Sequence, residues 1–180
     1  MSRLASIQRE TLDTLGFVGI PLARAEQIHS NQVARVTGFS EIPAPGADAL
    51  VTTERGIALG IHVADCAAIY FVDRQLRGIA LAHSGRKGTE LDIATRTLKA
   101  LLAATGAKPA EIIAQISPCI RPPHYEVDFA AEIRSQLARA GLKEIHDCQT
   151  CTFSNPEKYY SYRRENGRTG RLLAAIAFKP

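Results

Sequence analysis

The predicted fold is organised around residues 56–89, which read GIALGIHVADCAAIYFVDRQLRGIALAHSGRKGT. Two short apolar runs in this stretch, residues 56–63 and 67–72, are typical of buried strands. A third run, residues 78–82, follows the polar segment 73–78, so we expect the second and third runs to pair as a hairpin. The stretch therefore predicts three consecutive buried strands.

A reactive thiol and an imidazole are expected at the ends of two neighbouring strands. Cys66 immediately precedes the second run, and His83 immediately follows the third. Asp65 could orient either group, although an aspartate at a strand end is equally often a turn former. A glycine-rich turn then leads to Thr89, whose hydroxyl has the right chemistry to cap the next helix.

Hydrophobic periodicity and turn residues predict the remaining elements. The clearest is a helix over residues 89–104, whose apolar stripe is Leu91, Ala94, Leu98, Leu101 and Leu102, with Gly106 ending the pattern. Further helices are expected over 2–15 and 129–140, the latter capped by Asp128, and strands over 33–36, 49–53, 111–117, 142–147 and 171–178. Because hairpins and crossovers occur together, the predicted fold class is α+β with mixed sheets rather than a doubly wound sheet.

Length and composition indicate one globular domain over residues 1–180. The net charge of +4 is mild and the basic residues are scattered, which favours a small anionic ligand over nucleic acid. The N-terminus lacks the apolar segment of a signal peptide, and no run approaches the ~18 apolar residues of a membrane span. We therefore expect a cytoplasmic protein with four reduced cysteines and neither a membrane nor a nucleic-acid partner.

His29, Cys66 and His83 come from three separate predicted elements and together suit a catalytic zinc site. Zinc favours thiolate and imidazole, and its catalytic sites combine three protein ligands with an open position. Two alternatives stay open: each histidine alone is more commonly structural, and Cys66 with His83 would also suit a metal-free cysteine hydrolase. His62 points to the same side of its strand as Cys66 and could reach the same site.

Two further patterns lie near the C-terminus. Cys148 and Cys151 form a lone C-x-x-C, which is a poor zinc signal, so one or both are expected to be packing residues. Residues 159–164, YYSYRR, place aromatic rings beside Arg163 and Arg164. Arginine binds phosphate through a bidentate fork and aromatic rings stack on planar bases, although a solvated surface loop explains the same composition equally well.

Seven motifs occur in an order that resembles one known family. They are QIH (27–29), DALVT (48–52), ADC (64–66), HSGRKGT (83–89), PCI (118–120) with YEV (125–127), CT (151–152), and SYRR (161–164) with TGR (169–171). From about residue 25 onward, the chain resembles the laccase-domain family, also described as polyphenol oxidases or multicopper-oxidase-like purine nucleoside phosphorylases. No single motif is decisive, but seven in register are highly specific.

The resemblance implies a layered α/β/β/α fold, like that of the catalytic domain of the cytotoxic necrotizing factor toxins. It implies zinc ligands at His29, Cys66 and His83. It also implies phosphorolysis of adenosine, inosine and methylthioadenosine, with adenosine deamination as a further family activity. The laccase name implies copper, but none of the five histidines forms a His-x-His pair, so we expect zinc instead.

Some departures from the family pattern bear on activity. Arg86-Lys87 stands where Trp-Arg is usual, so a point charge at Lys87 replaces a bidentate guanidinium. Ser117 precedes Pro118 where glycine is usual. The N-terminal strand segment of full-length members, with its Thr-Arg-x-Gly-Gly motif, is missing from the sequence, so the chain reads as a member shortened at its N-terminus.

The leading hypothesis is a zinc-dependent enzyme that acts on a purine nucleoside and phosphate. The residues expected to hold phosphate or stabilise developing charge are Lys87, Arg163 and Arg164, and Tyr125 or an aromatic of residues 159–162 would stack on the base. The first alternative is a metal-free cysteine amidase or peptidase, with Cys66 as nucleophile and His83 as base. The second is a member that binds zinc and ligand without turnover.

Overall fold

The computed structural model describes residues 3–178. Its α-helices are α1 (Arg3–Thr14), α2 (Arg86–Glu90), α3 (Ile93–Thr105) and α4 (Phe129–Arg139), with a 3-10 helix at Pro109–Glu111. Its strands are β1 (Leu22–Arg24), β2 (Val33–Val36), β3 (Ala49–Thr52), β4 (Ala58–Val63), β5 (Ala67–Asp73), β6 (Ile79–Ser84), β7 (Ile112–Ile116), β8 (Glu144–Asp147) and β9 (Leu172–Ile176).

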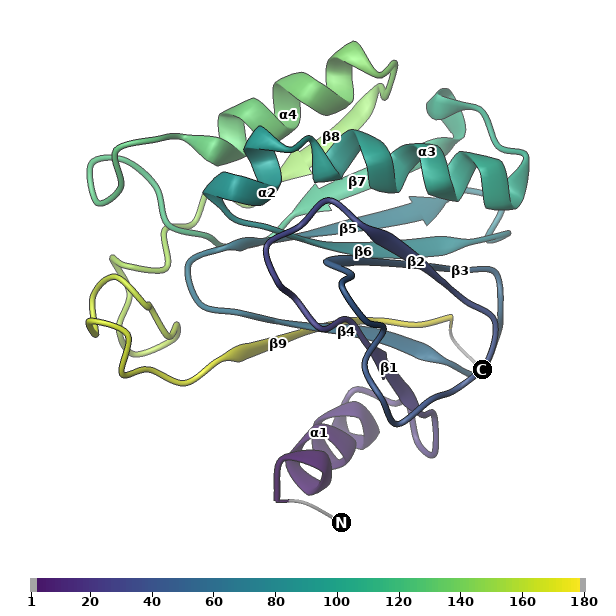
Figure 1. The fold of residues 1–180 in the computed structure, drawn as a ribbon, viewed down its shortest axis with the longest axis horizontal. Coiled ribbons are helices and arrows are strands. Elements are labelled where there is room, and N and C mark those ends of the chain that lie inside the picture. The colour runs from purple at the N-terminus through teal and green to yellow at the C-terminus, as the bar shows by residue number, and fades with distance from the viewer. Residues whose placement is uncertain (1–2, 179–180) are drawn as a thin grey trace.

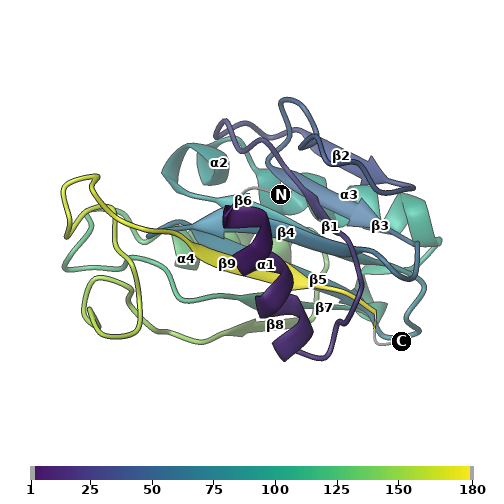
Figure 2. The same ribbon diagram turned by 90° about the horizontal axis from the view of Figure 1, so that it is seen from below.

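These elements form two β-sheets between two layers of helix (Figure 1). The smaller sheet has the strand order β1-β4-β9, and the larger has the order β2-β3-β6-β5-β7-β8. Helix α1 covers the outer face of the smaller sheet, and the other three helices cover the outer face of the larger one (Figures 1 and 2). Both sheets combine parallel with antiparallel pairs, so the predicted α+β fold with mixed sheets is confirmed. The likeness to the toxin domain stays a prediction.

The chain passes from the smaller sheet to the larger one between β4 and β5. Apolar side chains of β4, including Leu59 and Ile61, pack between the sheets against Leu50 and Leu81 of the larger sheet. Since helices cover its other face, β5 is largely buried on both sides, which explains its nearly continuous apolar sequence. At the crossover itself, Asp65 adopts a left-handed backbone with φ of 82°.

The predicted hairpin between the second and third apolar runs is confirmed. Strands β5 and β6 pair antiparallel, with Ala67 opposite Ser84 at one end and Val72 opposite Ile79 at the other. The register places Cys66, which directly precedes β5, beside the end of β6 that carries His83. The two groups are thus brought together by ordinary strand pairing.

The predicted continuous helix over residues 89–104 is wrong. Helix α2 ends before Leu91, and α3 begins after Asp92, whose φ of 58° is left-handed. Thr89 does not cap a helix but lies inside α2, where its hydroxyl donates a hydrogen bond to the Gly85 carbonyl. The break leaves Leu91 exposed and outside the apolar stripe, while Gly106 ends α3 in the left-handed conformation as predicted.

Most other elements agree with the prediction to within two residues at their ends. Strand β2 has the predicted bounds, and the Asp128 side chain caps α4 by accepting a hydrogen bond from the Ala131 amide. Strand β1 escaped prediction, because its three residues are too few to show a period. The predicted start of α1 at Ser2 lies outside the described residues.

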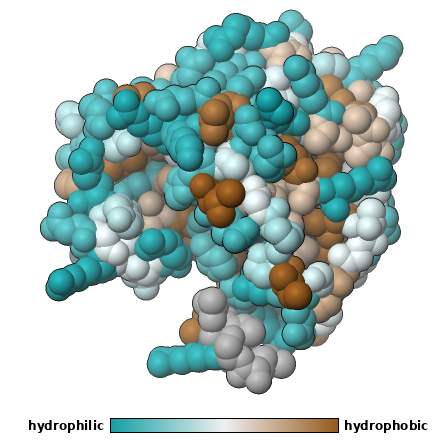
Figure 3. Space-filling view, in the orientation of Figure 1, coloured by the Kyte–Doolittle hydropathy of each residue, from teal (hydrophilic) through white to brown (hydrophobic). Residues whose placement is uncertain are grey.

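On the face drawn in Figure 3, apolar side chains are scattered among hydrophilic ones. None of the helices in the described part of the chain combines the length and the hydrophobicity needed to cross a bilayer.

We expect the Asp73→Asn variant to destabilise the β5–β6 hairpin. The buried Asp73 carboxylate accepts hydrogen bonds from the amides of Gln75 and Arg77 and from the Arg77 guanidinium. Replacing this charge in a buried network should lower the free energy of unfolding by about 2 kcal/mol at pH 7, measured by urea denaturation. The exposed Asp13→Asn variant is the control and should change it little.

The same difference should shrink in acid. Hydrogen bonds from Arg77 lower the pKa of Asp73 against the opposing effect of burial. A carboxyl whose pKa is lower in the folded chain contributes its full stability above its ordinary pKa of about 4, and loses it as the pH falls through the folded pKa. An undiminished gap between wild type and Asp73→Asn at pH 2 would contradict this account.

Candidate active site

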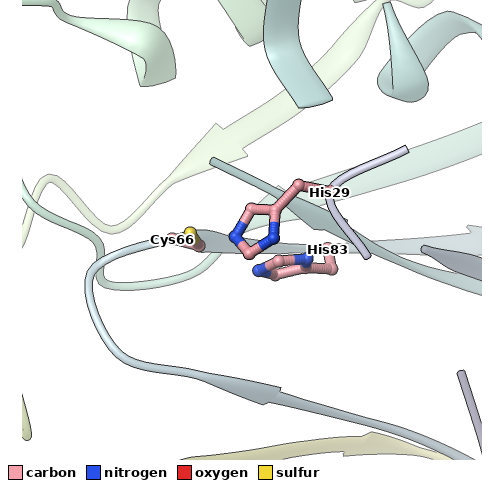
Figure 4. Close-up of side chains that lie close together, drawn as sticks. All are labelled: His29, Cys66 and His83. Atoms are coloured by element: carbon pink, nitrogen blue, oxygen red, sulfur yellow. The ribbon is translucent and has the colours of Figure 1, made fainter. Parts of the chain in front are cut away.

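His29, Cys66 and His83 converge on one point, as Figure 4 shows. His29 belongs to the loop between β1 and β2, Cys66 to the crossover between β4 and β5, and His83 to β6. Their ligand atoms all lie within 4.8 Å of one another, and the imidazole rings meet edge-on with centroids 4.9 Å apart. Among residues 3–178, these three form the one group of His, Cys, Asp or Glu side chains placed to hold a metal ion.

The completely buried carboxylate of Asp48 fixes two of these three residues. It accepts hydrogen bonds from the backbone amides of Ile28, His29 and Ser30 at 3.1, 3.0 and 2.6 Å. It also accepts one from Nδ1 of His83 at 2.8 Å, which leaves Nε2 of His83 free to face the cluster. Burial alone would raise the pKa of Asp48, but the hydrogen bonds from His83 and Ser30 lower it to about 2. Asp48 therefore stays ionised, and it holds the imidazole of His83 and the backbone of His29.

The thiol and the imidazoles shift one another's protonation. Burial alone would raise the pKa of Cys66, but hydrogen bonds with His29 and then His83 lower that pKa to about 7. Burial would likewise lower the pKa of His83, but hydrogen bonds with Asp48 and then Cys66 raise it to about 9. Between these values, the metal-free protein is expected to hold a thiolate beside an imidazolium.

Gly85 leaves room for the sulfur of Cys66. A Cβ atom at this glycine would lie 2.4 Å from the Cys66 Sγ and 3.9 Å from Cδ2 of His29. Real Cβ atoms do not approach a sulfur this closely, so a side chain at position 85 would push Cys66 away. The missing side chain thus belongs to the construction of the cluster.

A second buried carboxylate, that of Asp65, holds the C-terminal loop against the cluster. It accepts hydrogen bonds from the hydroxyls of Thr152 and Ser161 at 2.7 and 3.0 Å, and from the Arg163 backbone amide at 2.7 Å. These partners lie 87 to 98 residues further along the chain. Because Asp65 directly precedes Cys66, the loop that carries Arg163 is fixed to the same segment as the candidate ligand.

The cluster opens into a cavity of about 1180 Å³. Its basic lining residues are Arg86, Arg163 and Arg171, its aromatic ones are Tyr125, Phe129 and Tyr162, and its acidic ones are Glu26, Asp65 and Glu126. Tyr162 keeps 55% of its surface exposed, whereas Phe129 is buried. A cavity of this size, with rings and guanidinium groups around a candidate metal site, suits a small anionic or aromatic ligand.

Of the three basic residues predicted to act on phosphate, one lines the cavity and two do not. Arg163 lines the cavity. Lys87 is exposed and does not line it, whereas its neighbour Arg86 does. The guanidinium of Arg164 is taken up by backbone carbonyls of Thr152, Phe153 and Tyr159, which makes this side chain an internal brace of the loop.

His62 lines the cavity, but it is not one of the three side chains that converge as candidate metal ligands. Its Nε2 lies 2.9 Å from the side-chain nitrogen of Gln8 in α1, and its backbone exchanges hydrogen bonds with the side chain of Gln27. Because an amide nitrogen only donates, Nε2 of His62 is the acceptor and the ring proton resides on Nδ1. Burial and then the nearby Arg24 lower the pKa of His62, so the ring is neutral at pH 7.

Sequence reasoning missed the roles of Asp48, Arg86 and Glu126. All three belong to motifs that carried the family resemblance, so a signal was present without a role attached to it. The two cysteines of the C-x-x-C pattern differ in burial: Cys148 is exposed, whereas Cys151 is partly buried and packs against the core. None of the four cysteines is in a disulfide.

Comparisons with known proteins show which family the chain resembles. The chain is 33% identical over 204 residues to the purine nucleoside phosphorylase Cgl2154/cg2365 of Corynebacterium glutamicum, covering 96% of this chain and 80% of that protein. It is 34% identical over 190 residues to a purine nucleoside phosphorylase of Deinococcus radiodurans, covering 90% and 72%. The crystal structure of YlmD from Geobacillus stearothermophilus has a similar fold, with a TM-score of 0.91, 27% identity, and coverage of 98% of this chain and 80% of that one.

The family profile described as multi-copper polyphenol oxidoreductase laccase matches residues 3–132 and 127–179. The match thus begins ahead of residue 25, where the motifs seen in the sequence begin. Family membership rests on this match together with relatives above 30% identity over most of both chains. The chain therefore belongs to the multi-copper polyphenol oxidoreductase laccase family, among whose relatives are purine nucleoside phosphorylases.

Proposed function

We propose that the protein is a zinc-dependent phosphorylase of purine nucleosides. The observation that carries this proposal is the cavity, which joins a His-Cys-His cluster to aromatic rings and guanidinium groups. The names of the relatives supply the reaction, since they are called purine nucleoside phosphorylases. In that reaction, a phosphate oxygen forms a bond to C1′ of the ribose while the bond from C1′ to the base nitrogen breaks.

The donor atoms of the cluster fit zinc. Two imidazoles and a thiolate are ligands that zinc prefers, and three protein ligands with an open side are typical of catalytic sites. Nε2 of His83 is free to bind because Asp48 holds Nδ1, and this outer carboxylate is a common partner of a metal-bound histidine. Although the family is described as multi-copper, several coppers would need more ligands than this one group of three.

Each part of the cavity has a proposed role. His29, Cys66 and His83 would hold the zinc ion, which when bound would supply a Lewis acid for positioning and polarising a reacting oxygen. Arg163, assisted by Arg86, would hold the phosphate and offset its negative charge. Tyr162 is the most exposed of the three lining aromatic residues, so it would stack on the base. Lys87 and Arg164 would act on the ligand only indirectly.

The alternative against which this proposal is tested is the metal-free cysteine hydrolase. The Cys66 sulfur lies within 4.8 Å of a ring nitrogen of His83, and the two imidazoles lower the pKa of the thiol to about 7, which would make it an activated nucleophile in the metal-free protein. This candidate predicts a Cys66 that iodoacetamide labels readily and an activity that chelators do not affect. The zinc candidate predicts protection of Cys66 by metal and loss of activity on chelation.

We expect zinc-loaded protein to convert adenosine and phosphate into adenine and ribose 1-phosphate, as followed by chromatography. Cys66→Ala should lose the bound zinc and at least 100-fold in rate, because one of three ligands is removed. Cys148→Ala, which removes an exposed thiol, is the matched control and should keep both. Inosine formation in the same samples reports deamination. No turnover in a zinc-loaded sample would contradict the proposed activity and would favour a protein that binds zinc and ligand without turnover.

Asp48→Asn should weaken zinc binding by roughly 10- to 100-fold, the usual effect of losing the outer partner of a ligand histidine. The amide keeps one acceptor oxygen, but its NH2 group cannot accept, and it lacks the charge that holds His83 and the loop of His29 together. Competition with a chromogenic chelator measures the change in affinity. Equal zinc affinity in wild type and Asp48→Asn would mean that Asp48 does not position these ligands.

Gly85→Ala should destabilise the protein and displace Cys66, because the new methyl group overlaps its sulfur. Such overpacking typically costs about 1–3 kcal/mol, which thermal unfolding detects as a lower melting temperature. Gly88→Ala is the control three residues away: its Cβ would stand 3.4 Å from the nearest atom, the carbonyl oxygen of His83. If both variants melt like wild type and bind zinc equally, the close approach at Gly85 is not a constraint.

A further inference from the structure

The carboxylate of Glu126 bridges two arginines that line the cavity. Its two oxygens lie 2.6 Å from Arg163 and 3.4 Å from Arg86. Arg86 starts α2, Glu126 lies in the loop before α4, and Arg163 lies in the C-terminal loop. Three segments far apart in sequence thus place one carboxylate between two guanidinium groups at the wall of the cavity.

A phosphate between Arg86 and Arg163 would make the same contacts as the Glu126 carboxylate. A guanidinium presents a planar fork of donors that suits carboxylate and phosphate alike. The three side chains keep 49–55% of their surface exposed, so water and small ions can reach the contact. Because ion pairs of this exposure contribute little net stability, a phosphate could replace the carboxylate at small cost.

Both arginines have further contacts that would keep them in place without Glu126. Arg86 also pairs with Glu90 one helical turn away, at 3.0 Å. The guanidinium of Arg163 lies over the ring of Tyr125 with a separation of 5.0 Å from the ring centre, and Asp65 holds its backbone amide. The Glu126 carboxylate has no such support, since within residues 3–178 it makes hydrogen bonds to these two arginines alone.

We propose that Arg86 and Arg163 form the phosphate subsite, and that Glu126 is an internal competitor that occupies this subsite until phosphate displaces it. The inference rests on the proposed function for its ligand, although the anion site itself does not require turnover. Displacement leaves two guanidinium charges facing a doubly charged phosphate, with Glu126 turned toward solvent. The carboxylate therefore raises the phosphate concentration at which the subsite is half filled.

Inorganic phosphate binding to the zinc-loaded 180-residue protein tests the proposal by calorimetry. Glu126→Gln should bind phosphate more tightly by on the order of fivefold, because a competing charge is removed. Arg86→Gln and Arg163→Gln should each weaken phosphate binding by at least that factor. Glu132→Gln is the matched control: it makes the same charge change on α4, where Glu132 pairs with Arg139 away from the cavity, and should leave the affinity unchanged.

Steady-state kinetics give a second readout. In Glu126→Gln the KM for phosphate should fall while the KM for the nucleoside stays constant, a split that a general loss of structure does not produce. If the protein binds phosphate with the predicted pattern but shows no phosphorolysis, the subsite stands and the proposed function fails. Phosphate affinity in Glu126→Gln that is no higher than in Glu132→Gln overturns the competitor, and wild-type affinity in both arginine variants overturns the subsite.

Discussion

A single buried carboxylate, that of Asp48, is the constraint on which the candidate site depends. An ionised group without any access to water is tolerated only when hydrogen bonds satisfy it. Here three consecutive backbone amides and one imidazole do so, and these donors belong to the two segments that carry His29 and His83. The requirement to satisfy one charge therefore fixes two candidate ligands relative to each other.

Asp65 plays the corresponding part for the third candidate ligand and for the cavity wall. It lies where the chain leaves one sheet for the other, so its position is set by two strands with buried faces, β4 and β5. From there it holds hydroxyls and an amide of the C-terminal loop, which has no regular strand or helix between β8 and β9. Asp48 and Asp65 lie next to strands of the sheets, and their hydrogen bonds hold the His29 loop and the C-terminal loop in fixed positions.

The sequence predicts those parts of the molecule that local pattern controls. Long apolar runs located β4, β5 and β6, and the same runs brought Cys66 and His83 together through strand pairing. The break between α2 and α3 was not predictable, since it depends on a left-handed Asp92 within an otherwise helical pattern. Nor was the choice of Arg86 over Lys87 at the cavity: successive residues of a helix point about 100° apart, and sequence alone does not say which of the two faces inward.

The backbone of His29 bears on whether the cluster is a metal site or a thiol–imidazole pair. Its φ of 60° is left-handed, a conformation that costs a residue with a side chain roughly 1–2 kcal/mol. Cys66 and His83 are already adjacent through strand pairing, so a hydrolase built on that pair would need no second imidazole. The chain nevertheless holds His29 in this strained conformation with the Asp48 hydrogen bonds and turns its ring onto the same point. A three-ligand site requires a third donor at this point, whereas a thiol–imidazole pair does not, so the strained position of His29 supports the proposed metal site.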